Sequence, residues 1–293
     1  MSSLKVGFIG IGNIGMPMAK SLIKKGFPVI VFDINQNAVA EIKPLGASAA
    51  GSPKELSISC NSIISMVRDE SQIDQIIFGQ NGVWEGITEG KTIIISSTVS
   101  PGYCRQLYAK AAARKVRVLD APVTDPSGQK HILGGLTIMV GGDKDVVDQN
   151  WPIFQAMGEH IFYMGEIGNG QVCKLVHQIN AFNIGAVTRE SLNMGVKAGL
   201  NLKTMVEALS QGLGSTRGLQ TMAQNLKERK SSSSPQTSAA RPAAGSMGIR
   251  DRMLALELAK EVGAEMPVAD YIQQLDSSSL YQAYLSAMKD YQS

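Results

Sequence analysis

Three glycines near the amino terminus have the spacing of a phosphate-binding turn. Gly10, Gly12 and Gly15 follow an apolar run and precede a segment of helical periodicity. The first glycine permits a tight turn, the second lets the backbone approach a pyrophosphate, and the third lets helix and strand pack closely. Free N–H groups at the start of the helix then bind phosphate oxygens. A turn without a ligand is the alternative, but this context favours a dinucleotide site with contacts from Gly10, Ile11, Gly12, Asn13, Ile14 and Gly15.

Asp33 indicates which dinucleotide binds. It ends the next apolar run, close to the spacing of about 20 residues after the glycines that NAD-binding folds use. Its carboxylate accepts hydrogen bonds from both ribose hydroxyls of NAD and repels the additional phosphate of NADP. Residues 34–37 contain no Arg or Lys to neutralise that phosphate. The sequence therefore predicts a preference for NAD, with NADP as the less favoured cofactor, and equal efficiency with NADPH would contradict it.

These residues require a parallel sheet to position them. Apolar, strand-like runs alternate with helical patterns as far as residue 140, which predicts a doubly wound α/β sheet. Beyond about residue 170 the strand patterns stop, and a long helical pattern covers 172–199. We expect an α/β fold class with a Rossmann domain over 1–164, an interdomain helix over about 170–199, and an all-α domain over 165–293. The expected strands are 4–9, 28–32, 62–67, 92–96, 116–121 and 136–140, and the later helices are 202–211, 218–230, 248–262 and 269–289.

The composition excludes several classes of function. The chain has 293 residues, 44% of them hydrophobic and 18% charged, with a formal net charge of +3, which suits two globular domains. Its basic residues form no stripe for nucleic acid, and its cysteines and histidines are too far apart for a zinc site. No apolar run approaches the ~20 residues of a membrane span, and the amino terminus does not resemble a signal peptide. We therefore expect a cytoplasmic protein that acts on a small molecule, without nucleic-acid, membrane or metal partners.

Five motifs, the first of which contains the glycine turn, occur in a family-specific order along the chain. They are residues 7–19 (GFIGIGNIGMPMA), Ser97-Thr98 with Pro101, residues 120–123 (DAPV), residues 136–142 (LTIMVGG), and residues 165–170 (GEIGNG) with Cys173-Lys174. Together they resemble the β-hydroxyacid dehydrogenase family, which includes 3-hydroxyisobutyrate dehydrogenase, tartronate semialdehyde reductase and other semialdehyde reductases. The resemblance extends over nearly the whole chain. It implies a Rossmann domain joined by a long helix to a helical substrate domain, and a hydride transfer between NAD(P) and a small hydroxy acid or alcohol.

The resemblance also implies that Lys174 is the catalytic acid/base. A reductase must deliver a hydride to the carbonyl carbon and a proton to its oxygen, and a protonated lysine polarises the carbonyl and stabilises the developing alkoxide. Residues three and four apart share one face of a helix, so His177 and Gln178 are expected beside Lys174. We expect Lys174 and Gln178 to be catalytic and all three to contact the substrate. Packing within the helix is the alternative for His177.

The substrate loop departs from the family pattern. Where relatives have Ser-Gly-Gly after Asp-x-Pro-Val, this chain has Thr124-Asp125-Pro126-Ser127-Gly128. Pro126 has no N–H to donate, and Asp125 adds a negative charge where a carboxylate would bind. With Thr124, Asp125 and Ser127 as substrate contacts, we expect a substrate that lacks the usual carboxylate or carries a compensating cation. An Asp125 that only faces solvent is the alternative.

The remaining predicted cofactor contacts are Met66, Val67, Thr98 and Arg250. Arg250-Asp251 stands where the family usually has Lys-Asp, which keeps the charge but changes its geometry. The Ser- and Pro-rich segment 231–245 is expected to be a surface loop. Amphipathic helices without a covering layer predict a homodimer or homotetramer.

Two other functions remain open from the sequence. One is an imine reductase-like enzyme, although such relatives commonly lack the lysine that Lys174 matches. The other is a cofactor-binding scaffold with little turnover, which the altered loop at 124–128 would suit. Binding of NAD without oxidation of any alcohol in a broad panel would favour the scaffold.

Overall fold

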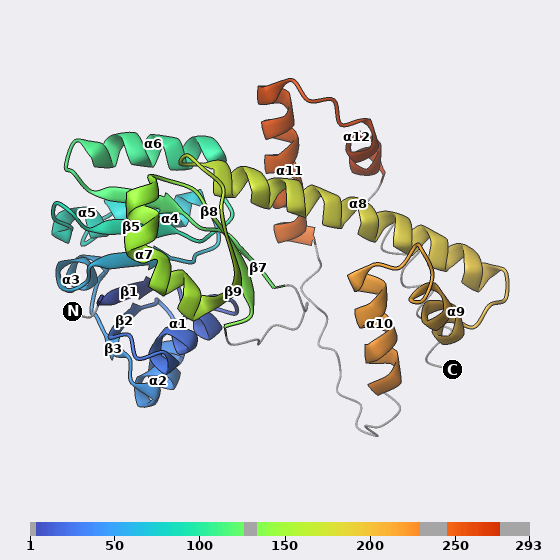
Figure 1. Cartoon of the computed structure of the whole chain (residues 1–293), viewed down its shortest axis with the longest axis horizontal. Coiled ribbons are helices and arrows are strands. Elements are labelled where there is room, and N and C mark those ends of the chain that lie inside the picture. Colours follow the sequence, from blue (N-terminus) through green and yellow to red (C-terminus); the bar gives the residue numbers. More distant parts are fainter. Residues whose placement is uncertain (1–3, 126–133, 229–244, 276–293) are drawn as a thin grey trace. The chain divides into compact units, whose positions relative to one another are not determined.

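The computed structural model describes residues 4–125, 134–228 and 245–275 (Figure 1). The chain divides into two compact units, Met1–Lys174 and Leu175–Ser293. The division falls within the long helix α8 (Asn169–Lys197).

A parallel six-stranded sheet forms the centre of the first unit. Its strands lie in the order β3-β2-β1-β4-β5-β6 and all neighbouring pairs are parallel. The order reverses between β1 and β4, and in sheets of this kind ligands bind at that point, outside the carboxyl ends of the strands. The strand bounds are β1 (Val6–Ile9), β2 (Val29–Phe32), β3 (Ser48–Ala49), β4 (Ser62–Ser65), β5 (Thr92–Ile95) and β6 (Arg117–Asp120).

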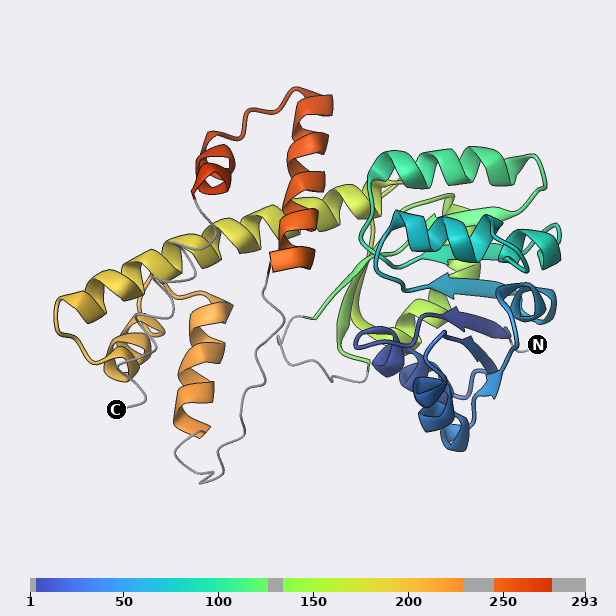
Figure 2. The ribbon, with the colours of Figure 1, turned by 180° about the vertical axis from the view of Figure 1, so that it is seen from behind.

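Helices cover both faces of this sheet, as Figures 1 and 2 show. Side chains alternate along each strand, so Phe8 belongs to one core with helices α1, α2 and α7, whereas Ile9 belongs to the other with helices α3, α4 and α6. Burial on both faces explains why the central strands read as continuous apolar runs. The predicted fold class is confirmed. The helix bounds are α1 (Gly15–Lys24), α2 (Gln36–Ile42), η1 (Lys43–Leu45), α3 (Pro53–Ser59), α4 (Glu70–Phe78), α5 (Val83–Gly86), α6 (Pro101–Ala112) and α7 (Lys144–Met157).

A smaller sheet of three strands extends the first unit. Strand β8 (Leu136–Val140) pairs antiparallel with β7 (Val123–Thr124) and parallel with β9 (Gly158–Tyr163). An antiparallel bridge between Asp120 and Gly141 joins the end of β6 to the end of β8. The predicted strand 136–140 has these bounds, whereas β3, β7 and β9 were not predicted.

The described part of the second unit is entirely helical. Beyond α8 it contains α9 (Leu202–Leu209), α10 (Arg217–Glu228), α11 (Gly245–Val262) and α12 (Pro267–Gln274). One apolar core joins the end of α8 to α9 and α10, and a second joins an earlier part of α8 to α11 and α12. Residues 231–244 of the predicted surface loop and the end of the predicted helix 269–289 lie outside the described residues. No helix in the described part of the chain combines the length and the apolar character that crossing a bilayer requires.

Candidate active site

The glycine turn has the three features that its sequence predicted. Gly10 adopts φ +89°, and a Cβ there would collide with the carbonyl oxygen of Met66, while one at Gly15 would collide with that of Gly10. At Gly12 a Cβ would meet no atom of the described residues within 4 Å. No side chain caps the start of α1 at Ile14. The turn therefore has an open face beside an uncapped helix start, which fits a pyrophosphate group.

Asp33 lies beside this turn at the carboxyl end of β2. Its Oδ2 accepts a hydrogen bond from the N–H of Ile11 at 2.7 Å, and its Oδ1 accepts one from the N–H of Asn35, also at 2.7 Å. Each carboxylate oxygen can accept a second hydrogen bond. The carboxylate is thus held against the glycine turn and keeps acceptor capacity for ribose hydroxyls.

The loops after β4 and β5 meet at the same edge of the sheet. The Ser97 hydroxyl donates to the carbonyl of Val67 at 2.8 Å and accepts from the N–H of Val67 at 2.9 Å. Met66 donates its N–H to the carbonyl of Ile9 at 2.9 Å. Met66, Val67 and half-buried Thr98 are therefore brought to the carboxyl edge that carries the glycine turn.

Asp120 ends β6 and binds the start of α8. Its side chain is fully buried, with Oδ1 accepting from the N–H of Gly168 and Oδ2 from the N–H of Gln171, both at 2.7 Å. Burial raises the pKa of this carboxyl to about 6, although the two N–H donors and Arg105 act in the opposite direction. The sequence motif included Asp120, but this role was missed. The signal was a charged residue ending an apolar strand, since a buried charge requires partners.

Gln171 is a second functional candidate that sequence reasoning missed. Its side chain is fully buried. The carboxamide donates to the carbonyl of Ser97 at 2.8 Å and accepts from the N–H of Val99 at 3.2 Å. It therefore holds both sides of Thr98 against the first turn of α8.

Lys174 follows Gln171 by one helical turn and is 6% exposed. It lies in the first unit with the glycine turn and Asp120, whereas His177 and Gln178 continue α8 in the second unit. A buried lysine on the helix that the carboxyl edge holds is well suited to proton transfer.

Gln178 and Arg250 meet at one carboxylate in the second unit. Gln178 donates its Nε2–H to Oδ2 of buried Asp251 at 2.7 Å, and Arg250 forms an ion pair with Oδ1 at 2.9 Å. Nη1 of Arg250 is buried and has no hydrogen-bond partner among the described residues. The predicted catalytic amide and the predicted cofactor-binding cation are therefore joined through Asp251.

The predicted substrate loop is described only in part. Thr124 ends β7 and Asp125 follows it, and both are half-buried. Ser127, with the remainder of 126–133, lies outside the described residues.

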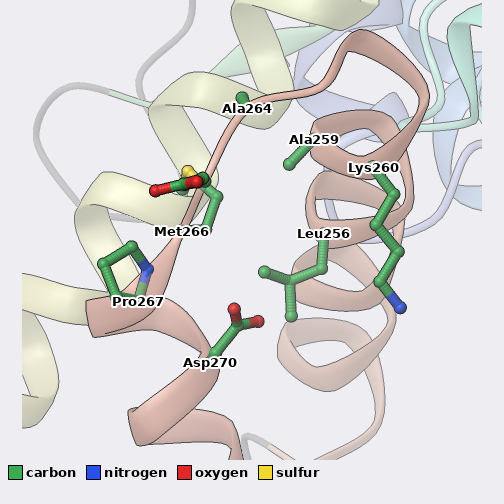
Figure 3. A pocket seen from close by; sticks show the side chains of 8 residues that line it. Leu256, Ala259, Lys260, Ala264, Met266, Pro267 and Asp270 are labelled. Carbon is green, nitrogen blue, oxygen red and sulfur yellow. The ribbon is translucent and has the colours of Figure 1, made fainter.

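Away from the carboxyl edge, the described residues include a cavity but no metal-binding cluster. The described residues contain no cluster of three His, Cys, Asp or Glu side chains that would hold a metal ion. A cavity of about 300 Å³ lies between α11 and α12 in the second unit (Figure 3). Its lining mixes apolar side chains with Lys260, Glu265 and Asp270, and it includes none of the predicted site residues.

Two family models match the chain in succession. Residues 5–165 match the NAD binding domain of 6-phosphogluconate dehydrogenase. Residues 168–292 match the NAD-binding domain of NADP-dependent 3-hydroxyisobutyrate dehydrogenase.

Individual relatives of this chain are also dehydrogenases. The mitochondrial 3-hydroxyisobutyrate dehydrogenase of Mus musculus is 32% identical over 73% of this chain, and the match spans 63% of that enzyme's length. The NAD-dependent L-serine dehydrogenase of Pseudomonas aeruginosa is 33% identical over 74% of this chain and 72% of its own. The crystal structure of a 3-hydroxyisobutyrate dehydrogenase from Salmonella typhimurium superposes with a TM-score of 0.79 at 24% identity, covering 98% of this chain and 99% of that one, which shows a shared fold. These matches show that the chain belongs to the β-hydroxyacid dehydrogenase family.

Proposed function

We propose that this protein is an NAD-dependent oxidoreductase that interconverts a small hydroxy acid or alcohol and its aldehyde or ketone. The observation that carries the proposal is that one compact unit contains both an open glycine turn beside Asp33 and the buried residue Lys174. The family models and the named dehydrogenase relatives support it.

The residues of this chain have separate tasks in that reaction. The bound nicotinamide supplies or accepts the hydride. The open face at Gly12 and the uncapped start of α1 bind the pyrophosphate, and Asp33 binds the ribose hydroxyls. Lys174 gives a proton to the carbonyl oxygen in reduction and takes it from the hydroxyl in oxidation. Gln178 orients the reacting oxygen from the next turn of α8, and the Arg250 guanidinium adds positive charge for the cofactor.

Asp33 also supports NAD rather than NADP. Its Oδ2 is bonded to the turn at Ile11 and its Oδ1 to the N–H of Asn35, so an added phosphate on the ribose would meet a negative charge here. Gln36, which donates to the carbonyl of Asp33 at 3.1 Å, is neutral and provides no compensation. Steady-state kinetics with both cofactors test this, and an equal or higher kcat/KM with NADP would reject it.

Asp125 supports a substrate that carries a cation. Asp125 is half-buried and follows the end of β7. Its negative charge would repel the carboxylate of a substrate and attract an ammonium group. A β-hydroxy amino acid meets this condition, and a relative of this chain is an L-serine dehydrogenase. We expect Asp125→Asn to lower kcat/KM for such substrates more than for 3-hydroxyisobutyrate.

A substrate screen tests the function as a whole. Hydroxy acids, β-hydroxy amino acids and simple alcohols are incubated with NAD, and NADH absorbance is followed. Turnover of at least one class supports the proposal. Tight NAD binding with no turnover would favour the scaffold, and reduction of imines but not carbonyls would favour an imine reductase, a reading that Lys174 disfavours.

The second unit supports self-association. Several of its large apolar side chains are more than half exposed, which is typical of surfaces that another chain covers. They are Val176, Val187, Met194, Leu200, Leu213, Val262, Val268 and Tyr271. A homodimer or homotetramer is expected, and a monomeric mass by light scattering would reject it.

A further inference from the structure

A continuous series of contacts runs through the first unit from the glycine turn to α8. Gly10 packs against the carbonyl of Met66, and the next residue, Val67, is held at both its N–H and its carbonyl by Ser97. Ser97 is held in turn by Gln171. Every link joins segments that are far apart in the sequence, so the series fixes loops relative to one another rather than stabilising one element.

We propose that Asp120 and Gln171 are positioning residues that set where the Lys174 amine lies relative to Thr98. This inference rests on the proposed function for its catalytic consequence, but its structural content is independent of it. Neither side chain has an open route to substrate, because both are fully buried. They act through α8 and through the loop after β5.

Asp120 fixes the start of α8. Its backbone is anchored by hydrogen bonds in both directions with Gly141, and its two carboxylate oxygens each take one N–H from the start of the helix. A negative charge at this end also complements the helix dipole. Space for the carboxylate depends on glycines, because a Cβ on Gly141 or Gly170 would overlap its oxygens.

Gln171 connects that helix start to the loop that carries Thr98. Its carboxamide uses its donor on Ser97 and its acceptor on Val99, the residues on either side of Thr98. Lys174 lies three residues further along α8 and therefore on the same face as Gln171. A shift of the helix start consequently moves the amine and the Thr98 loop with respect to each other.

A matched control is available at the opposite end of the same strands. Asn150 is 2% exposed, accepts from the Ser62 hydroxyl at 2.6 Å and donates to the carbonyl of Val146 at 2.8 Å. Its removal leaves buried polar groups unpaired, as removal of Gln171 does. Both variants should lose stability, but the partners of Asn150 within the described residues are Ser62, Thr92 and Val146, which lie away from the carboxyl edge.

The experiment compares Gln171→Ala, Asp120→Asn and Asn150→Ala in the full chain. The first readout is the rate at which an amine-specific reagent labels Lys174 in the folded protein, followed by mass spectrometry with exposed Lys25 as the internal reference. The second readout is the separation of kcat from KM and from the Kd for NAD. The labelling rate and kcat of each variant are divided by the fraction of that variant that is folded.

We expect labelling of Lys174 to rise by at least ~5-fold in Gln171→Ala and Asp120→Asn, since the helix start opens locally. We expect kcat to fall by roughly 10- to 100-fold, because misplacement by about 1 Å is enough for such a loss. The Kd for NAD should rise by a smaller factor, because Thr98 is one of several cofactor contacts and the glycine turn is unchanged. Asn150→Ala should change neither readout. Equal labelling and kcat in all three variants would overturn the proposal. If the wild-type protein turns over no substrate, the proposed function fails, and the labelling contrast alone still decides the positioning role.

Discussion

Two buried polar networks lie at opposite ends of strands β4 and β5, and they differ in what they hold. At the amino ends, Asn150 joins Ser62 to Val146 on its own helix α7. At the carboxyl ends, Ser97 and Gln171 bond to the backbone of loops and leave the adjacent turn at Gly12 open. Burial and hydrogen bonding are similar at the two ends. The two networks differ in the backbone that they bind. The network at the amino ends binds a helix, whereas the network at the carboxyl ends binds the loops that form the site.

The largest expected effect at the carboxyl end of the sheet is the loss of kcat in Lys174→Ala. Removal of the amine should lower kcat by about 10²- to 10⁴-fold, the usual contribution of a positioned acid/base, measured at a temperature at which the variant is folded. Exposed Lys197 on the same helix provides the control, and Lys197→Ala should retain wild-type kcat. A kcat for Lys174→Ala within threefold of wild type would remove the lysine from the mechanism.

The stability contribution of Asp120, at the carboxyl edge, should depend on pH. Burial raises the pKa of Asp120 from 3.8 to about 6, so the folded state binds more protons than the unfolded state between these values. The contribution of Asp120 to stability is therefore fully present below about pH 4 and is lost as the pH rises through about 6.

Asp120→Asn provides the reference for this measurement, because other titrating groups cancel in the difference. The free energy of unfolding of wild type relative to the variant should fall by on the order of 2–3 kcal/mol between pH 4 and pH 7. Arg105, which lowers the pKa of Asp120, and the Cys104 thiol lie nearby on α6. Urea unfolding at several pH values measures the difference, and a difference that rises with pH would contradict the predicted sign.

The two glycines of the turn should respond differently to one added methyl group. Gly15→Ala introduces a Cβ that collides with the Gly10 carbonyl, and we expect a loss of roughly 1–3 kcal/mol in stability. In Gly12→Ala the new Cβ meets no atom within 4 Å in the part of the chain that the structure describes, so stability should hold. The Kd for NAD should rise by about 10-fold or more, because the methyl group occupies the approach of the pyrophosphate. Thermal unfolding and calorimetry measure both, and unchanged NAD affinity in Gly12→Ala would place the pyrophosphate elsewhere.

The smallest expected effect concerns the choice of cofactor. Asp33→Asn removes the charge beside the turn and keeps the side-chain shape, so the ratio of kcat/KM for NADP to that for NAD should rise by about 10-fold. Kinetics with both cofactors measure this ratio. No change in it would show that Asp33 does not set the preference.

The sequence predicted those features of the carboxyl edge that depend on residues close together in the chain. The glycine spacing, Asp33 after an apolar run and the strand 136–140 each follow from neighbouring residues, and the structure has these elements. Strand β9 was missed because most of its side chains are exposed and show no apolar alternation. The contacts of Asp120 and Gln171 were missed because their partners lie 48 to 74 residues away. Only folding brings those segments together.

A crystal structure of the protein with NAD and a hydroxy acid tests the central claim most directly. We predict a pyrophosphate against the backbone of Gly12 and the Lys174 amine within about 3 Å of the substrate hydroxyl oxygen. A pyrophosphate bound away from this turn, or an amine too far from that oxygen to exchange a proton with it, would contradict the proposed mechanism.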